Sequence, residues 1–204
     1  VPTTVDELKD AILAIEALGN PDISAFGVTT MQHSNTYQDF SNFVVGEGSA
    51  LIKDGKYNLT SPEVIKAAED YNFVASRAPK GVSTEMLRQL FVDGKVAMII
   101  DGSFVVPLLE TADEDIKPYL KVAKTPFEYT PGTISNSLHM SANLSDERKA
   151  LVWEFMQQVA SPENQILYAN YTQGPCGRLS SSEGISDPMI AFMNEVGADT
   201  RSIL

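Results

Sequence analysis

Signals for the start of a helix recur along this chain more regularly than any other pattern. In two places a serine is followed by proline and glutamate, at Ser61-Pro62-Glu63 and at Ser161-Pro162-Glu163. The serine hydroxyl can accept a backbone N–H at the N-cap. Proline suits the first helical position because an N–H there has no helical partner. Apolar residues follow each signal at helical spacing. These patterns predict amphipathic helices that begin at both sites.

Four further helices are predicted from similar signals. Thr4 and Glu7 form a capping box, and Gly19-Asn20-Pro21 ends the helix that follows. The other predicted starts are Ser83 or Thr84, Ser145-Asp146-Glu147 and Ser186-Asp187-Pro188. Trp153 lies on the apolar face of the helix that begins near Ser145, so we expect its side chain in the core.

Short apolar runs between the helices predict strands. The clearest are residues 24–28 and 96–100, and weaker candidates lie at 121–124 and 133–141. Asp54-Gly55 is a turn signal that predicts a small hairpin. Because helices alternate with buried strands, the sequence predicts an α/β fold.

Composition excludes several classes of function. The chain has 15 Lys and Arg against 27 Asp and Glu, a net charge of −12, which disfavours nucleic acids and anionic membranes as partners. A single cysteine, Cys176, allows no internal disulfide and is expected to be a small residue in a tight loop. His33 and His139 lack zinc-site spacing, and no glycine-rich phosphate loop occurs. We therefore predict no catalytic residue, no metal site and no cofactor.

The segment 31–40 contains residues suited to binding a small polar molecule. It follows a predicted strand and mixes amides, hydroxyls and two aromatic rings, a combination that can recognise sugars. Alternatively, it is a polar loop and the start of a helix whose aromatic residues join the core. The second interpretation is favoured for Phe40 and Phe43. Both stay open for Asn35 and Tyr37.

A longer stretch carries a family resemblance. Phe91 and then Asp93-Gly94-Lys95-Val96-Ala97-Met98-Ile99-Ile100-Asp101-Gly102-Ser103-Phe104 resemble the segment F-x-x-Gly-Lys-x-Ala-Met-x-x-x-Gly-x-Trp of extracellular solute-binding proteins. These belong to the sugar-binding, maltose-binding-protein-like family that serves ABC importers. Further stretches resemble the family in the same order, at 2–8, 54–63, 150–165 and 173–175. The order and spacing of these matches cover nearly the whole chain.

The resemblance implies a fold and a division of the chain. Family members have two α/β lobes with a ligand cleft between them. It implies a lobe of the type II periplasmic-binding-protein kind, with a mixed sheet flanked by helices. Residues 1–132 would form the second, C-terminal lobe, 133–178 would cross to the first lobe, and 179–204 would return. We expect a fragment that lacks most of the first lobe.

The resemblance also implies ligand-binding residues. The loop with Asn35 and Tyr37 faces the cleft in the family. Phe104 takes the position of a tryptophan that stacks on the sugar, and Asp101 could accept hydroxyl groups or cap the following turn. Arg178 matches a position that can reach the ligand, although for this residue a surface ion pair is favoured.

The implied function is capture of a small solute, with a carbohydrate favoured, by closure of two lobes about a hinge. A membrane permease of an ABC importer would be the partner, and no bond would be made or broken. The expected location is periplasmic or extracellular, either free or lipid-anchored. With half the cleft absent, we expect weak or no solute binding and self-association through an uncovered apolar patch.

Two other classes of function are compatible with the sequence. A small glycoside hydrolase could use carboxylates such as Asp101 and Glu47, since such enzymes need two carboxylates at a defined separation. A non-catalytic interaction module that binds the missing lobe is the other alternative.

Overall fold

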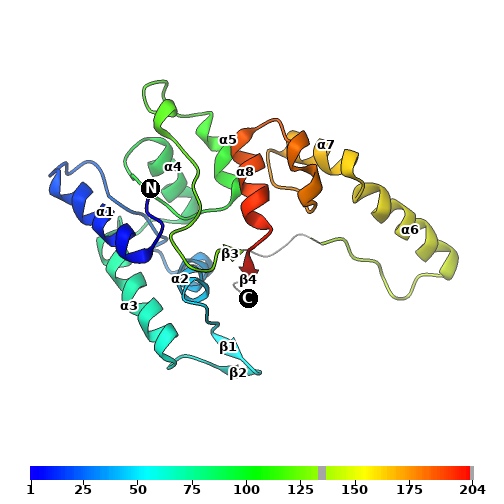
Figure 1. Cartoon of the computed structure of the whole chain (residues 1–204), viewed down its shortest axis with the longest axis horizontal. Coiled ribbons are helices and arrows are strands. Elements are labelled where there is room, and N and C mark those ends of the chain that lie inside the picture. The colour runs from blue at the N-terminus through cyan, green and yellow to red at the C-terminus, as the bar shows by residue number, and fades with distance from the viewer. Residues whose placement is uncertain (133–136, 203–204) are drawn as a thin grey trace. The chain divides into compact units, whose positions relative to one another are not determined.

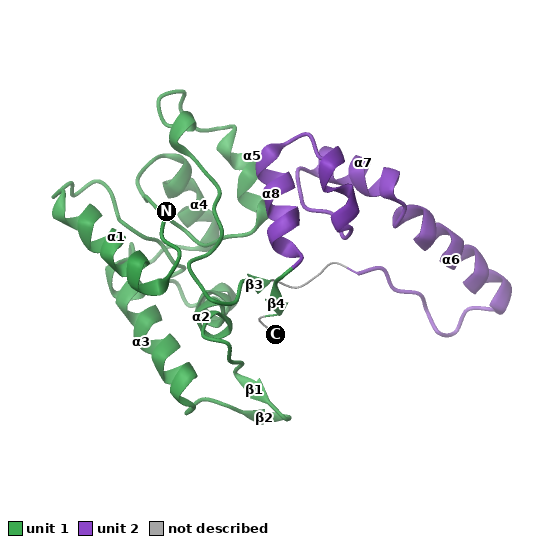
Figure 2. Ribbon diagram, viewed as in Figure 1, with its two compact units in different colours: residues 1–133, 199–204 green, residues 134–198 purple. Residues whose placement is uncertain are grey.

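The computed structural model describes residues 1–132 and 137–202, and the chain divides into two compact units (Figures 1 and 2). Unit 1 comprises residues 1–133 and 199–204, and unit 2 comprises residues 134–198. Within the described ranges, no helix has both the length and the apolar composition needed to cross a bilayer.

Unit 1 contains most of the helices. Its α-helices are α1 (Val5–Ala17), α2 (Ser34–Gly46), α3 (Pro62–Arg77), α4 (Thr84–Val92) and the short α5 (Val106–Leu109). Its 3₁₀ turns are η1 (Ser103–Val105) and η2 (Lys117–Tyr119). Its strands are β1 (Ile52–Lys53), β2 (Lys56–Tyr57), β3 (Pro131–Gly132) and β4 (Arg201–Ser202).

The predicted helix starts of unit 1 are confirmed. The hydroxyl of Ser61 accepts the amide of Val64 at the start of α3, and Ser83, not Thr84, caps α4. At α1 the Thr4 hydroxyl accepts the amide of Glu7, whose carboxylate reaches back to the Thr3 amide at 2.7 Å. Side-chain caps thus satisfy amides that the first turn leaves without helical partners.

The core of unit 1 lies between α1, α2, α3 and the apolar segment 24–28. Phe43 of α2 is buried at its centre, with its ring edge-on to Phe127 at 5.1 Å between centroids and to Tyr71 of α3 at 5.6 Å. Phe40 is partly buried and also contacts Tyr71. The expectation that Phe40 and Phe43 belong to the core is confirmed.

A buried ion-pair network joins three of these helices. The carboxylate of Asp70 is only 4% exposed and pairs with Lys9 of α1 and, at 3.0 Å, with Lys66 of α3. Lys66 also reaches Glu47 at the end of α2, at 2.5 Å. Burial of this carboxylate depends on the two lysines, because an unpaired charge in the core is costly.

Segments 24–28 and 96–100, each predicted as a strand, run parallel and side by side, but neither forms a regular strand. They form two isolated bridges, Ser24 with Val96 and Gly27 with Ile99. The amide of Gly27 donates to the carbonyl of Met98 at 3.0 Å. A side chain at Gly27 would overlap Leu87 of α4, so glycine allows α4 to pack directly on this backbone.

The two described sheets are small. β1 and β2 form the predicted antiparallel hairpin, and Asp54 and Gly55 both have positive φ, as a type I′ turn requires. β3 and β4 pair in parallel, which joins residues 201–202 to unit 1.

The two weaker strand predictions do not hold where the structure describes them. Residues 121–124 form no strand, and three of the four are exposed, because a short run with lysine at both ends buries too little apolar surface. Of the predicted strand at 133–141, residues 133–136 lie outside the described residues. Residues 137–141 are exposed and form no strand.

Unit 2 is helical. It contains α6 (Asp146–Val159), α7 (Pro162–Thr172), η3 (Leu179–Gly184) and α8 (Pro188–Gly197). Ser145 caps α6 and Ser161 caps α7, as predicted, while Asp187 is the cap of α8. Helices α7 and α8 both pack on η3. The assignment of residues 133–178 and 179–204 to particular lobes stays a prediction.

The expectation that Trp153 is a core residue is wrong. Trp153 is 54% exposed, and α6 has no buried residue. Helical spacing marked an apolar face, but in the described structure no layer of side chains covers it.

Candidate functional site

The candidate site begins where the two parallel segments of unit 1 end. Because residues 24–28 and 96–100 run in the same direction, the residues that follow them come to one edge. Thr29 follows the first segment and Asp101 follows the second. Ligands of α/β proteins commonly bind beyond the carboxyl ends of such segments.

Helix α2 begins at this edge and adds two polar side chains. His33 caps the helix, with its ring nitrogen accepting the Asn35 amide at 3.2 Å. Asn35 and Asp39 lie four residues apart and therefore share one face of α2. A carboxylate oxygen of Asp39 accepts the backbone N–H of Thr29 at 2.8 Å. The start of α2 is thereby attached to the end of the first segment.

Helix α4 contributes from the other side. The hydroxyl of Thr84 lies 3.0 Å from that of Thr29 and accepts the Asn35 side-chain amide at 2.5 Å. One turn later, Arg88 donates its Nε and Nη2 to the two oxygens of Asp101, at 2.6 and 2.8 Å. An oxygen of Asp101 also accepts the amide of Gly102 at 2.7 Å.

An aromatic ring lies beside these groups. Phe104 is 63% exposed, and the guanidinium carbon of Arg88 lies 5.7 Å from its ring centroid. A Cβ at position 102 would lie 3.2 Å from the ring, so Gly102 lets the phenyl group lie close over the backbone. The exposed ring can offer an apolar face to a bound molecule.

These residues form two contacting groups, each with a member on α4, and we call them together the polar cluster: Thr29, Asn35, Asp39 and Thr84 in one, and Arg88, Asp101 and Phe104 in the other. The polar cluster combines carboxylate and amide groups with an exposed aromatic ring. This combination suits a solute that has both hydroxyl groups and an apolar face.

The two carboxylates of the polar cluster differ in their surroundings. Asp101 is held by Arg88, and this hydrogen bond, opposed by burial, raises the pKa of the arginine. Burial raises the pKa of Asp39, the Thr29 amide and hydroxyl oppose the shift, and the charge of Asp101 adds to it. Burial, with the charge of Asp39, raises the pKa of Tyr71 to about 12.

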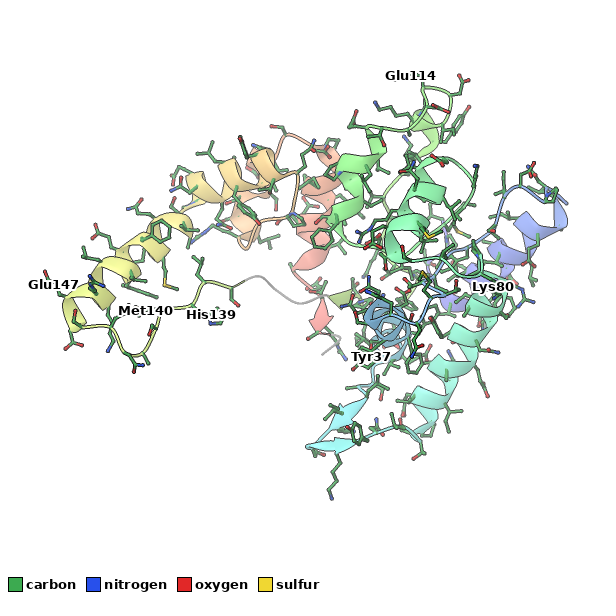
Figure 3. All side chains as sticks on the ribbon, turned by 180° about the vertical axis from the view of Figure 1, so that it is seen from behind. Tyr37, Lys80, Glu114, His139, Met140 and Glu147 are labelled. Carbon is green, nitrogen blue, oxygen red and sulfur yellow. The ribbon has the colours of Figure 1, made fainter. Side chains whose placement is uncertain are left out.

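The structure brings together three of the five predicted site residues. Asn35, Asp101 and Phe104 belong to the polar cluster. Tyr37 is 45% exposed on α2 (Figure 3). Because it lies two residues from both Asn35 and Asp39, it occupies a different face of the helix.

Arg178 is placed in unit 2, at the start of η3. Its Nε donates to the carbonyl of Ala160, the residue that ends α6, at 3.0 Å. No ion pair of Arg178 occurs within residues 1–132 and 137–202, so the surface ion pair that the sequence favoured stays a prediction. The guanidinium of Arg178 satisfies a carbonyl that the helix end leaves free.

Sequence reasoning missed Thr29, Asp39, Thr84 and Arg88 as site residues. Thr84 was noticed only as a possible helix cap, and Asp39 only as part of a polar segment. The pairing of Arg88 with Asp101 could not be predicted, because the two residues are 13 apart and belong to different elements. Helical spacing does place Thr84 and Arg88 on one face of α4, and this was the available clue.

Other polar groups have local roles. The described residues hold no cluster of three His, Cys, Asp or Glu suited to a metal ion. His139 lies 3.1 Å from the hydroxyl of Ser137, and the Cys176 thiol lies 3.2 Å from the carbonyl of Arg178 in its loop. The acidic loop 113–115 is exposed, as Figure 3 shows for Glu114.

The two carboxylates considered for a hydrolase are held by different cations. Glu47, at the far end of α2, bonds to Lys66 of α3, while Asp101 bonds to Arg88 of α4.

A separate hollow lies between α2 and α3. Its lining is mainly apolar and includes Phe40, Leu59, Val64 and Ile65. It offers few partners for hydroxyl groups, so the polar cluster is the better candidate for a polar solute.

Comparisons with known proteins give the family and fold. Residues 1–191 match the family model for bacterial extracellular solute-binding proteins. No match was found among curated protein sequences.

Solved structures share the fold at low sequence identity. A solute-binding protein from Thermotoga lettingae bound to α-D-tagatose is 24% identical, with a TM-score of 0.67 over 97% of this chain and 56% of its own. The cyclic α-maltosyl-1,6-maltose binding protein of Arthrobacter globiformis is 17% identical, with a TM-score of 0.78 over 99% and 54%. UgpB of Mycobacterium tuberculosis, bound to glycerophosphocholine, is 16% identical, with a TM-score of 0.65 over 99% and 53%.

The chain thus spans about half the length of these structures. The fold is that of part of a type II periplasmic binding protein, as the resemblance implied. With residues 1–191 matched to the family model, the chain belongs to the bacterial extracellular solute-binding proteins.

Proposed function

We propose that the polar cluster is one wall of the binding site for a carbohydrate or polyol in the solute-binding component of an ABC importer. The observation that carries this proposal is the exposed ring of Phe104 beside the bonded pair of Arg88 and Asp101, at the edge where the two parallel segments end and where Asn35 and Asp39 also lie. A sugar presents an apolar ring face to stack on the phenyl group and hydroxyls to bond the amide and carboxylate.

The solved relatives support this class of solute. One binds α-D-tagatose and another a cyclic maltosyl-maltose, both rich in hydroxyl groups. Within the complete receptor, closure of two lobes about a hinge would bury the solute, and the closed form would dock on a membrane permease. We place this receptor in the periplasm or outside the cell, and we propose that it acts without chemical conversion of the solute.

Saturation-transfer NMR tests solute binding by this chain directly. We expect transfer from the protein to millimolar D-tagatose, maltose or ribitol, and weaker transfer in Phe104→Ala. Tyr57→Ala is the matched control, because Tyr57 is also an exposed aromatic residue but lies on the β2 hairpin. No transfer to any sugar, or equal loss in both variants, would contradict the proposal.

A further inference from the structure

The pairing of Arg88 with Asp101 bears on which solutes the polar cluster can accept. Among the residues of the polar cluster, Arg88 carries the positive charge, and its side chain is 20% exposed. In other proteins, an arginine in a binding site can bind a phosphate or carboxylate of the ligand through its planar fork of N–H groups. Here the fork is already used within the protein.

The geometry of the pair is that of a strong, specific contact. Nε and Nη2 of Arg88 face the two oxygens of Asp101 at 2.6 and 2.8 Å, which makes the bond bidentate. The amide of Gly102 holds the same carboxylate at 2.7 Å, and the Asp101 side chain is only 12% exposed. Bidentate, charge-assisted bonds of this kind are among the strongest that proteins form.

Two further carboxylates lie near the pair. Asp39 is a second carboxylate of the cluster, and its charge interacts with that of Asp101. Glu85, one turn before Arg88 on α4, also acts on the guanidinium. In the described residues Asp39 has no cation within ion-pair distance. A bound anion would therefore meet net negative charge, whereas a hydroxyl group can donate to Asp39.

We propose that Asp101 serves as an internal anion that occupies the guanidinium of Arg88, so that the polar cluster admits uncharged polyhydroxy solutes and rejects phosphorylated or carboxylated ones. This inference rests on the proposed function and adds the charge class of the solute. Specificity then comes partly from repulsion between the carboxylates of the polar cluster and an anionic ligand. Asp101 and Arg88 are specificity-determining residues in this account, and Asn35, Asp39 and Phe104 contact the solute.

Titration with inorganic phosphate tests the role of Asp101. The readout is the NMR signal of the Arg88 Nε–H in the wild-type chain, in Asp101→Asn and in Asp39→Asn. We expect no saturable shift in the wild type and a saturable shift in Asp101→Asn, with affinity higher by roughly tenfold or more. Asp39→Asn is the comparison, because it removes one negative charge without freeing the guanidinium, and its gain in phosphate affinity should be much smaller than that of Asp101→Asn.

Three outcomes would overturn the inference. The first is saturable binding of phosphate at Arg88 in the wild type. The second is no gain in phosphate affinity in Asp101→Asn. The third is an equal gain in Asp39→Asn, which would mean that net charge alone determines phosphate affinity. If Asp101→Asn does not fold, Asp101→Ser frees the same guanidinium and carries the same expectation. The gain should disappear in the double variant Arg88→Gln/Asp101→Asn.

The phosphate titration does not depend on a sugar being found. If no sugar binds but Asp101→Asn gains phosphate binding, the proposed function fails and the role of Asp101 as an internal anion stands. If sugars bind and the wild type also binds phosphate at Arg88, the proposed function stands and the inference about charge fails.

Discussion

The carboxylate of Asp39 accepts the backbone N–H of Thr29 at 2.8 Å and joins helix α2 to the end of the first parallel segment. The bond holds a charged group in a partly buried position close to a second carboxylate, Asp101. A neutral isostere would keep an acceptor for the Thr29 amide and lose the charge. The charge of Asp39 therefore lowers the stability of the fold while it provides an acceptor for the solute.

Asp39→Asn should raise the free energy of unfolding at pH 7. Burial, with the charge of Asp101, raises the folded-state pKa of Asp39 above its ordinary value of 3.8, so the ionised form is less favourable in the folded than in the unfolded chain. Protonation favours folding here. The advantage of Asp39→Asn should therefore be full above the raised pKa and shrink as pH falls towards 3.8. Urea unfolding of both chains at several pH values measures this, and an advantage that grows on acidification would contradict it.

Asp70→Ala should destabilise unit 1 by about 1–3 kcal/mol, because it leaves Lys9 and Lys66 without their buried partner. Glu69→Ala is the matched control, since Glu69 is the neighbouring exposed acid on α3 and should change stability by less than about 0.5 kcal/mol. Urea unfolding followed by circular dichroism gives both values. Equal effects of the two substitutions would show that the network contributes little.

Phe104→Ala should weaken sugar binding roughly two- to tenfold, the range expected for one aromatic contact. The ring is mostly exposed, so the unfolding midpoint should hardly change. Phe104→Trp should strengthen binding, because indole offers more stacking area. Affinities from NMR titrations decide this, and unchanged affinity in both variants would remove Phe104 from the site.

The exposed apolar side chains of α6 predict self-association. Leu151 and Phe155 are 61% and 63% exposed and lie one turn apart on the same face. Sedimentation velocity should show the weight-average mass rising with concentration, and Leu151→Ser with Phe155→Ser should suppress the rise. Ile52→Ser, on the exposed β1 strand, is the control. A monomer at all concentrations would contradict the expectation.

Much of the local structure could be predicted because its causes are local. Ser61 and Ser161 cap their helices through amides three residues away, and Asp54-Gly55 forms its turn within the hairpin. Such contacts form between residues that are close in the sequence, so the sequence alone predicts them. The short run at 121–124 failed because a strand also needs a neighbour and an apolar layer, and neither is encoded within four residues.

The site was only partly predictable for the same reason. Asp101 and Phe104 follow a motif, so the resemblance identified them. Arg88 was missed because its importance comes from a contact between two elements. Composition left the role of Tyr37 open and the resemblance placed its loop at the cleft, but the helical geometry of α2 puts Tyr37 on a different face from Asn35 and Asp39.

Amide chemical-shift mapping with D-tagatose tests the central claim most directly, because it shows where on the chain a sugar binds. We predict saturable shifts concentrated at Asn35, Asp39 and residues 101–104. Absence of any saturable shift would contradict the account. So would shifts concentrated instead in the hollow near Leu59 and Ile65 or in the loop around Arg178.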